Sequence, residues 1–141
     1  MKRLIFPWAV ILLVISMALV SYAKMEKIVI STGDLPDLKG KWKGSRFVDM
    51  SGGRNTDLEI TNDSLPVQGK FTFYDVLMGS QSGQQTAITD LKGWINDQGN
   101  LLFKGPNIEV ELSLYKDDGK MKLEGNFFSQ GAKGTMSFKK K

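Results

Sequence analysis

The sequence predicts an all-β protein, an antiparallel up-and-down meander of about eight strands. Apolar and polar residues alternate, most clearly between Ile108 and Leu114, as in strands with one buried face. Turn dipeptides such as Asp118-Gly119 separate these segments. A third feature is a repeated triplet of an apolar residue, a glycine and a large apolar residue at alternate positions, which lie on one face of a strand. The five triplets are Leu38/Gly40/Trp42, Val67/Gly69/Phe71, Leu91/Gly93/Ile95, Leu123/Gly125/Phe127 and Ala132/Gly134/Met136.

Residues 1–23 have the pattern of a signal peptide. Lys2 and Arg3 precede an apolar run, and Ser21-Tyr22-Ala23 supplies small residues for cleavage. We therefore expect a signal helix, and export to the periplasm or the outside of the cell. The alternative is an uncleaved single-pass membrane anchor, because the run approaches the roughly 20 residues that span a bilayer.

The remaining chain divides into a lead-in segment, 24–37, and a single β-barrel domain, 38–141. The lead-in carries a short apolar patch around Val29, which suits one edge strand. No segment after residue 23 shows a helical period. Ser51-Gly52-Gly53 is expected to be a turn, and the polar stretch from Leu77 to Gln85 a loop. The expected strands are 38–48, 56–61, 67–76, 87–95, 100–105, 107–115, 120–128 and 132–139.

A meander with one apolar face buries that face by closing into a barrel or by folding into a flattened sandwich. The glycines of the triplets favour a strongly coiled sheet, since they allow bends and close approach. Closure is the architecture that we predict.

Composition argues against catalysis. The chain contains no His and no Cys, which removes the commonest general base, the commonest metal ligands and the thiol nucleophile. The carboxylate pairs have simpler explanations: Asp117 and Asp118 suit a hairpin turn, and Glu109 and Glu111 suit a solvated strand face. We predict a protein that is not an enzyme, with no catalytic residues, no metal and no cofactor.

The charge pattern argues against nucleic-acid binding. Of 19 Lys and Arg, two lie in the first three residues and three form the C-terminal Lys139-Lys140-Lys141 run, while 15 Asp and Glu are interleaved with the others. A nucleic-acid site needs a clustered basic face. A membrane contact is expected only through residues 1–23, if these are not cleaved.

Gly40-Lys41-Trp42 near the expected mature start, followed by Gly69-Lys70-Phe71-Thr72 in a later strand, resembles the calycin group of barrels, the avidins and lipocalins. The resemblance implies a calycin-like barrel or flattened sandwich whose interior can hold a small apolar molecule. Biotin-binding residues do not carry over: Gly44 stands where avidins have Asn, and Tyr74 falls on the face opposite Phe71.

Two functions follow from this fold. In one, the barrel binds a small apolar ligand in an interior lined by Trp42, Phe71, Phe73, Phe127 and Met136. In the other, these side chains fill a solid core, and the protein is a structural or protein-interaction module of the cell envelope. Its partner or oligomer interface would then use aromatic residues on the outer strand faces, namely Tyr74, Trp94, Tyr115 and Phe128. A cavity above roughly 300 Å³ would favour the first function.

Overall fold

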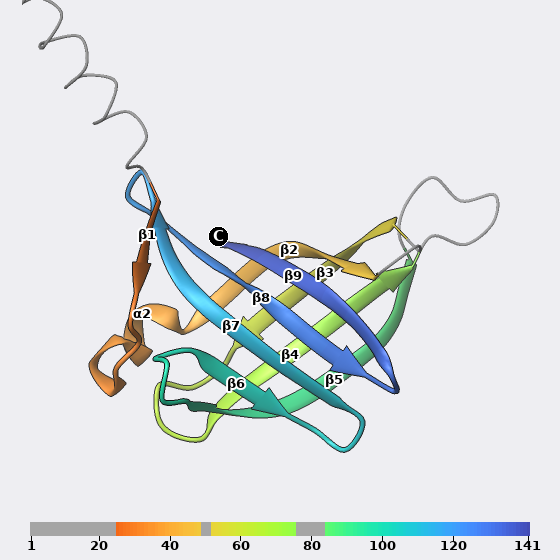
Figure 1. The fold of residues 1–141 in the computed structure, drawn as a ribbon, viewed down its shortest axis with the longest axis horizontal. Coiled ribbons are helices and arrows are strands. Elements are labelled where there is room, and N and C mark those ends of the chain that lie inside the picture. The colour runs from red at the N-terminus through yellow and green to blue at the C-terminus, as the bar shows by residue number, and fades with distance from the viewer. Residues whose placement is uncertain (1–24, 49–51, 76–83) are drawn as a thin grey trace, which may run out of the picture.

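The chain forms a closed antiparallel β-barrel of eight strands with one extra strand outside it (Figure 1). The computed structural model describes residues 25–48, 52–75 and 84–141. Each barrel strand pairs with the next along the chain, and the last strand pairs back onto the first between Trp42 and Val48. The barrel strands are β2 (Gly40–Val48), β3 (Gly52–Ile60), β4 (Val67–Asp75), β5 (Gln84–Ile95), β6 (Leu101–Lys104), β7 (Ile108–Asp117), β8 (Lys120–Ser129) and β9 (Ala132–Lys140).

The predicted all-β fold and its closure are confirmed, and two strands begin three or more residues before their expected starts. β3 begins at Gly52 rather than after a turn, because Gly52 and Gly53 pair with Val48 and Phe47. The Phe47 ring lies over Gly53, where a Cβ would come within 2.8 Å of it. β5 also begins earlier than expected, at Gln84. Residues 77–83 of the predicted loop and the predicted signal helix lie outside the described residues.

The first residues after the predicted signal peptide form a strand that pairs with β7 beyond the end of β6. β6 is short and pairs only with residues 109–112 of β7. β1 (Met25–Ile28) occupies the same edge of β7 further along, pairing with residues 114–117. Beyond β1, the Ile30 amide donates to the Gly99 carbonyl in the β5–β6 turn, at 2.9 Å. This lead-in strand therefore lies on the barrel as a ninth strand.

Two short helical turns follow β1 and correct the expectation that no helix occurs after residue 23. These are η1 (Thr32–Asp34) and α2 (Leu35–Leu38). Asp34 initiates them, because its carboxylate accepts hydrogen bonds from both the amide and the hydroxyl of Ser31. A single turn is too short to display a helical period, which is why the sequence pattern does not reveal it.

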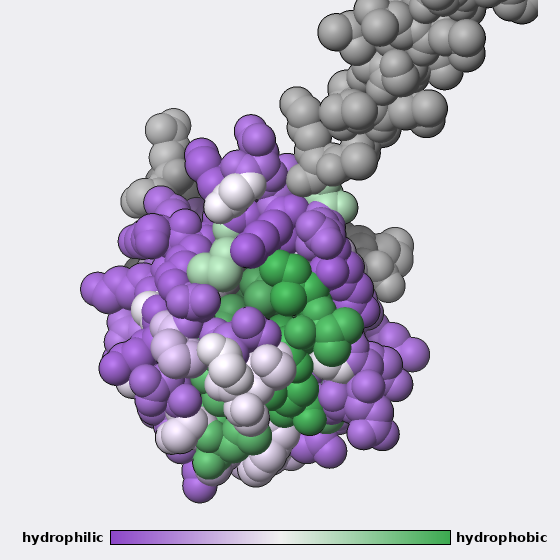
Figure 2. Space-filling view, turned by 90° about the vertical axis from the view of Figure 1, so that its left-hand side faces the viewer, coloured by the Kyte–Doolittle hydropathy of each residue, from purple (hydrophilic) through white to green (hydrophobic). Residues whose placement is uncertain are grey.

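The helical turns close one end of the barrel, shown at the left of Figure 1. Ile30, Leu35 and Leu38 are buried there and join the barrel core. Trp42 is only 1 % exposed beneath them, and its Nε1–H donates to the Leu38 carbonyl at 2.9 Å. Figure 2 looks onto this end and shows hydrophobic surface framed by hydrophilic side chains. Val29, in the connection after β1, is 69 % exposed.

The interior next to this closed end is packed solid. Phe103 fills the space that the inward glycines leave: a Cβ on Gly69 or Gly93 would lie 2.6 or 2.7 Å from its ring. Phe71 packs edge-on against Phe103, with ring centroids 5.3 Å apart. Leu58, Leu112 and other aliphatic side chains surround them. The glycines in this part of the barrel therefore make room for an aromatic side chain of the protein itself.

Candidate functional site: the open end of the barrel

The end opposite α2 is hollow. The β2, β4, β6 and β8 strands finish at this end, and a cavity of about 590 Å³ opens there. This volume lies within the range of small-molecule sites. The cavity is lined by inward-facing residues of β2, β4, β5, β7 and β8 and by the β6–β7 and β8–β9 turns. They are Arg46, Phe73, Asp75, Ala87, Thr89, Pro106, Asn107, Ile108, Phe127, Ser129 and Gln130.

The floor of this cavity is apolar. Phe73 stacks on Phe71 of the packed core, with ring centroids 6.3 Å apart and planes inclined by 12°. Ile108 is half-buried, and Phe127 is buried beside Gly134, whose Cβ would meet the Phe127 ring at 2.5 Å. The cavity therefore begins where the solid core ends.

One wall of the cavity is incomplete. β5 pairs with β4 through residues 84–93, but with β6 only through residues 92–95. Among the described strands, none pairs with the other edge of β5 at Ala87 to Thr89. Pro106, Asn107 and Ile108 line the same cavity as Ala87 and Thr89. In the part of the chain that the structure describes, the side of the site is thus bordered by an unpaired strand edge, between β5 and the β6–β7 turn.

Arg46 is the cation in this cavity, and its side chain is only 12 % exposed. Its Nη2 lies 2.7 Å from Asp75 Oδ1, and its Nη1 donates to Thr56 Oγ1 at 3.0 Å and to the Asn55 carbonyl at 3.2 Å. The guanidinium also lies over the Phe73 ring, 5.0 Å from its centroid. Arg54 approaches the same Asp75 oxygen with its Nε at 3.8 Å. Two cations therefore share one carboxylate.

Burial governs the electrostatics of Arg46. Desolvation lowers the pKa of Arg46 from its usual range, Asp75 opposes this change, and the nearby charge of Arg54 adds to it. The guanidinium remains protonated at neutral pH. The cavity consequently holds a largely buried guanidinium beside an aromatic floor, with the more exposed Asp75 carboxylate paired to it.

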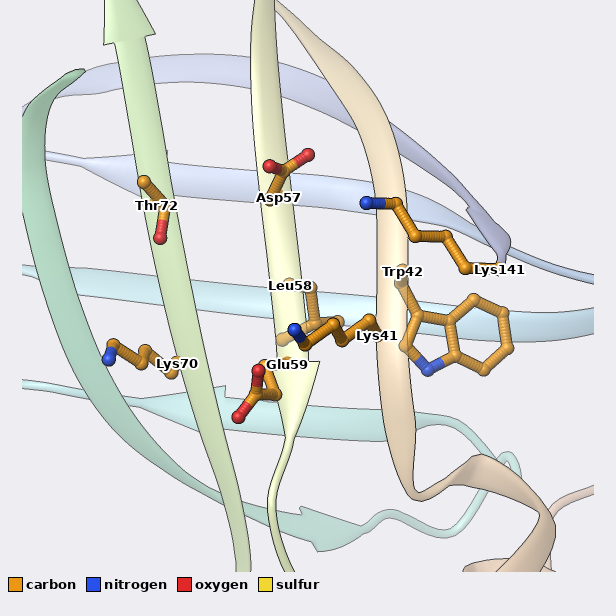
Figure 3. A pocket seen from close by; sticks show the side chains of 8 residues that line it. All are labelled: Lys41, Trp42, Asp57, Leu58, Glu59, Lys70, Thr72 and Lys141. Atoms are coloured by element: carbon orange, nitrogen blue, oxygen red, sulfur yellow. The ribbon is translucent and has the colours of Figure 1, made fainter.

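A second hollow, of about 210 Å³, lies on the outer surface of β2, β3 and β4 (Figure 3). Its side chains carry charges of both signs: Lys41, Lys70 and Lys141 with Asp57 and Glu59. Trp42 and Leu58 border it but are buried in the core. Among the described residues, no three His, Cys, Asp or Glu side chains gather as metal ligands would. This hollow resembles an ordinary solvated strand face more than a ligand site.

The structure divides the five residues predicted to line the interior. Phe73 and Phe127 line the cavity at the open end. Trp42, Phe71 and Met136 belong to the packed core and do not line that cavity. Trp42 lies next to α2, whereas Met136 pairs with the cavity residue Arg46 and is nevertheless buried in the core.

The four outer aromatic residues predicted for an interface lie on four strands, β4, β5, β7 and β8. Trp94 on β5 is 44 % exposed and pairs with Leu102 on β6. Phe128 on β8 is 47 % exposed and lies between Glu109 and Lys133. Tyr115 on β7 pairs with Lys27 and Lys122. In the described strand pairings, no two of the four lie directly opposite each other.

Tyr74 on β4, the fourth of these residues, is half-buried and donates from its hydroxyl to Asp57 Oδ2 at 3.2 Å. Desolvation raises the pKa of the Tyr74 hydroxyl, and the Asp57 charge and hydrogen bond raise it further. A raised folded-state pKa contributes stability that is present below the unfolded value, near pH 10, and is lost as the pH rises through the folded value.

We expect Asp57→Asn to lower the midpoint of Tyr74 ionisation. The measurement is tyrosinate absorbance in residues 24–141 carrying Tyr115→Phe, where Tyr74 is the tyrosine that remains. The same substitution should weaken the loss of stability above about pH 10. An unchanged titration curve would show that Asp57 does not act on this hydroxyl.

Arg46, Asp75 and Ile108 are cavity residues that the sequence reasoning does not single out. Arg46 lies four positions after Trp42, so strand alternation places both on the inner face. The even spacing between Trp42 and Arg46 therefore indicates a charged side chain on the inner face of the strand. The closeness of Asp75, 29 positions further along, depends on the pairing of the strands and has no local signature.

No protein-family model matches this chain, and no curated protein or solved structure matches it either. In the described part of the chain, no helix combines the length and the apolar character needed to cross a membrane. The site is therefore interpreted from its own geometry.

Proposed function

We propose that this protein is an exported, non-enzymatic barrel that binds a small molecule with an apolar body at the open end. The observation that carries the proposal is the cavity of about 590 Å³ above a solid core. Its apolar floor of Phe73, Ile108 and Phe127 offers the burial that drives such binding. The closed eight-stranded barrel is compatible with a calycin-like architecture at this coarse level.

The packed core supports a site at the open end rather than along the barrel axis. Phe103 and Phe71 occupy the centre of the interior, so a ligand at the open end rests on them indirectly, through Phe73. The gap beside β5 offers a side entry between Ala87 and Asn107. A ligand would thus be half-enclosed, with its apolar part inside and another part reaching solvent.

Filling the cavity by mutation tests this proposal. Ala87 lines the cavity, whereas Ile88 is its neighbour on the same strand, is 48 % exposed and points outward. We expect residues 24–141 to bind the neutral fluorescent probe N-phenylnaphthylamine. Ala87→Trp should weaken this binding about tenfold or more, which is about 1.4 kcal/mol.

Ile88→Trp is the matched control, because it adds the same side chain to the opposite face of β5 and should leave probe affinity unchanged. Equal weakening by both variants would place the probe outside the cavity. A wild-type protein that binds neither the probe nor a molecule retained from its host would contradict the proposal. The envelope interaction module would then be the function to test.

A further inference from the structure

The cavity combines an apolar floor with one poorly hydrated cation, and this combination selects a ligand class. Phe73, Ile108 and Phe127 accept an apolar body, while Arg46 lies at the β2 side of the same cavity. Its hydrogen bonds to Asn55, Thr56 and Asp75 use three of the five N–H groups of a guanidinium. Among the described residues, two of its donors therefore remain for a ligand.

We propose that the open end binds an amphipathic carboxylate, with the apolar tail on the aromatic floor and the carboxylate on Arg46. This inference rests on the proposed ligand-binding function. A guanidinium matches a carboxylate because two parallel N–H groups meet two oxygens, and charge-assisted bonds of this kind are the stronger ones. The low exposure of the Arg46 side chain strengthens the interaction further, since little water is present to screen it.

Charge balance in the cluster supports an anionic head group. Arg46 and Arg54 carry two positive charges around the single Asp75 carboxylate, to which they lie at 2.7 and 3.8 Å. One positive charge is left over within these three side chains. A ligand carboxylate would compensate it, whereas a cationic head group would be repelled and a neutral one would leave it uncompensated.

Asp75 competes with such a ligand, and this competition provides a test with a distinctive sign. Removing the Asp75 charge while keeping its shape, as in Asp75→Asn, frees Arg46 for the ligand and removes like-charge repulsion. We therefore expect Asp75→Asn to tighten carboxylate binding. A purely structural role of the Arg46–Asp75 pair predicts the opposite, because breaking that pair would loosen the cavity.

Decanoate and decanol are suitable probes, because they share a tail and differ in the head group. The affinity of each is measured by its displacement of N-phenylnaphthylamine from residues 24–141. The pH is about 8, where the decanoate carboxylate is ionised. Arg46→Gln should weaken decanoate binding by roughly 10- to 100-fold, the range for hydrogen bonds to charged groups. The same variant should leave decanol binding nearly unchanged. Asp75→Asn should tighten decanoate alone.

Lys122→Gln is the matched control. Lys122 also forms a part-buried ion pair, with Glu124 at 2.6 Å, but it does not line the cavity. It should change neither affinity. If Arg46→Gln fails to fold, the effect of Asp75→Asn on the ratio of decanoate affinity to decanol affinity is sufficient to test carboxylate recognition.

The outcomes separate the two proposals. If neither Arg46→Gln nor Asp75→Asn changes the ratio of decanoate affinity to decanol affinity, carboxylate recognition is overturned while the ligand-binding function stands. A wild-type protein that binds none of the three probes would overturn the ligand-binding function itself. If the ratio of decanoate affinity to decanol affinity falls in Arg46→Gln and rises in Asp75→Asn, both proposals are supported.

Discussion

Trp42→Ala is expected to lower the free energy of unfolding by about 3–5 kcal/mol, the range for truncating a large buried aromatic side chain. Trp42 is buried where the barrel meets α2, so its removal leaves a cavity between the strands and the closing segment. Lys140 Nζ also lies 5.9 Å from the Trp42 ring centroid and donates to the Asp37 carbonyl. The substitution thus removes the hydrogen bond between β2 and α2 and the ring contact of Lys140, but it leaves the hydrogen bond between Lys140 and Asp37.

Trp42→Phe is the matched control for this loss. Phenylalanine retains an aromatic ring but lacks the Nε1–H that donates to the Leu38 carbonyl. We expect it to destabilise by about 1–3 kcal/mol, the cost of an unpaired buried group, and thus by less than Trp42→Ala. Urea unfolding followed by circular dichroism measures both variants. Equal stability of wild type and Trp42→Ala would show that Trp42 does not tie α2 to the barrel.

Most strands of this barrel are readable from the sequence because their signal is local. Alternation with a period of two assigns a face to each residue, and turn residues such as Asp118-Gly119 mark the boundaries. The strands with the clearest alternation, β7 and β8, are predicted to within two residues. β3 starts earlier than expected because Gly52 and Gly53 pair with Val48 and Phe47, a pairing that no local pattern reveals.

The candidate site is less predictable, because it depends on how far the core extends along the barrel. Alternation places Phe71 and Phe73 on the same face, yet one is in the core and the other lines the cavity. Inward glycines do not show from the sequence whether the space beside them is empty or filled by another side chain. Gly69 and Gly93 suggest empty space in the sequence, but Phe103 from β6 occupies it. Only the pairing of distant strands decides which inner positions are filled.

Gly125→Ala is expected to destabilise the barrel by about 3 kcal/mol, at the upper end for overpacking, because its clash is with backbone. A Cβ on Gly125 would lie 1.7 Å from the carbonyl oxygen of Glu111 and 3.0 Å from the Cα of Leu112. Gly125 faces Leu112 in the β7–β8 ladder, and β8 also pairs with β9. Relief therefore requires displacing a strand that is held on both sides.

Gly33→Ala is the control, since it adds the same carbon where the nearest atom would be Ser31 Oγ, at 3.8 Å. Its effect should remain within about 0.5 kcal/mol, as for a surface substitution. Urea midpoints of both variants and of the wild type make the comparison. If Gly125→Ala were as stable as Gly33→Ala, β7 and β8 could not approach as closely as the structure shows.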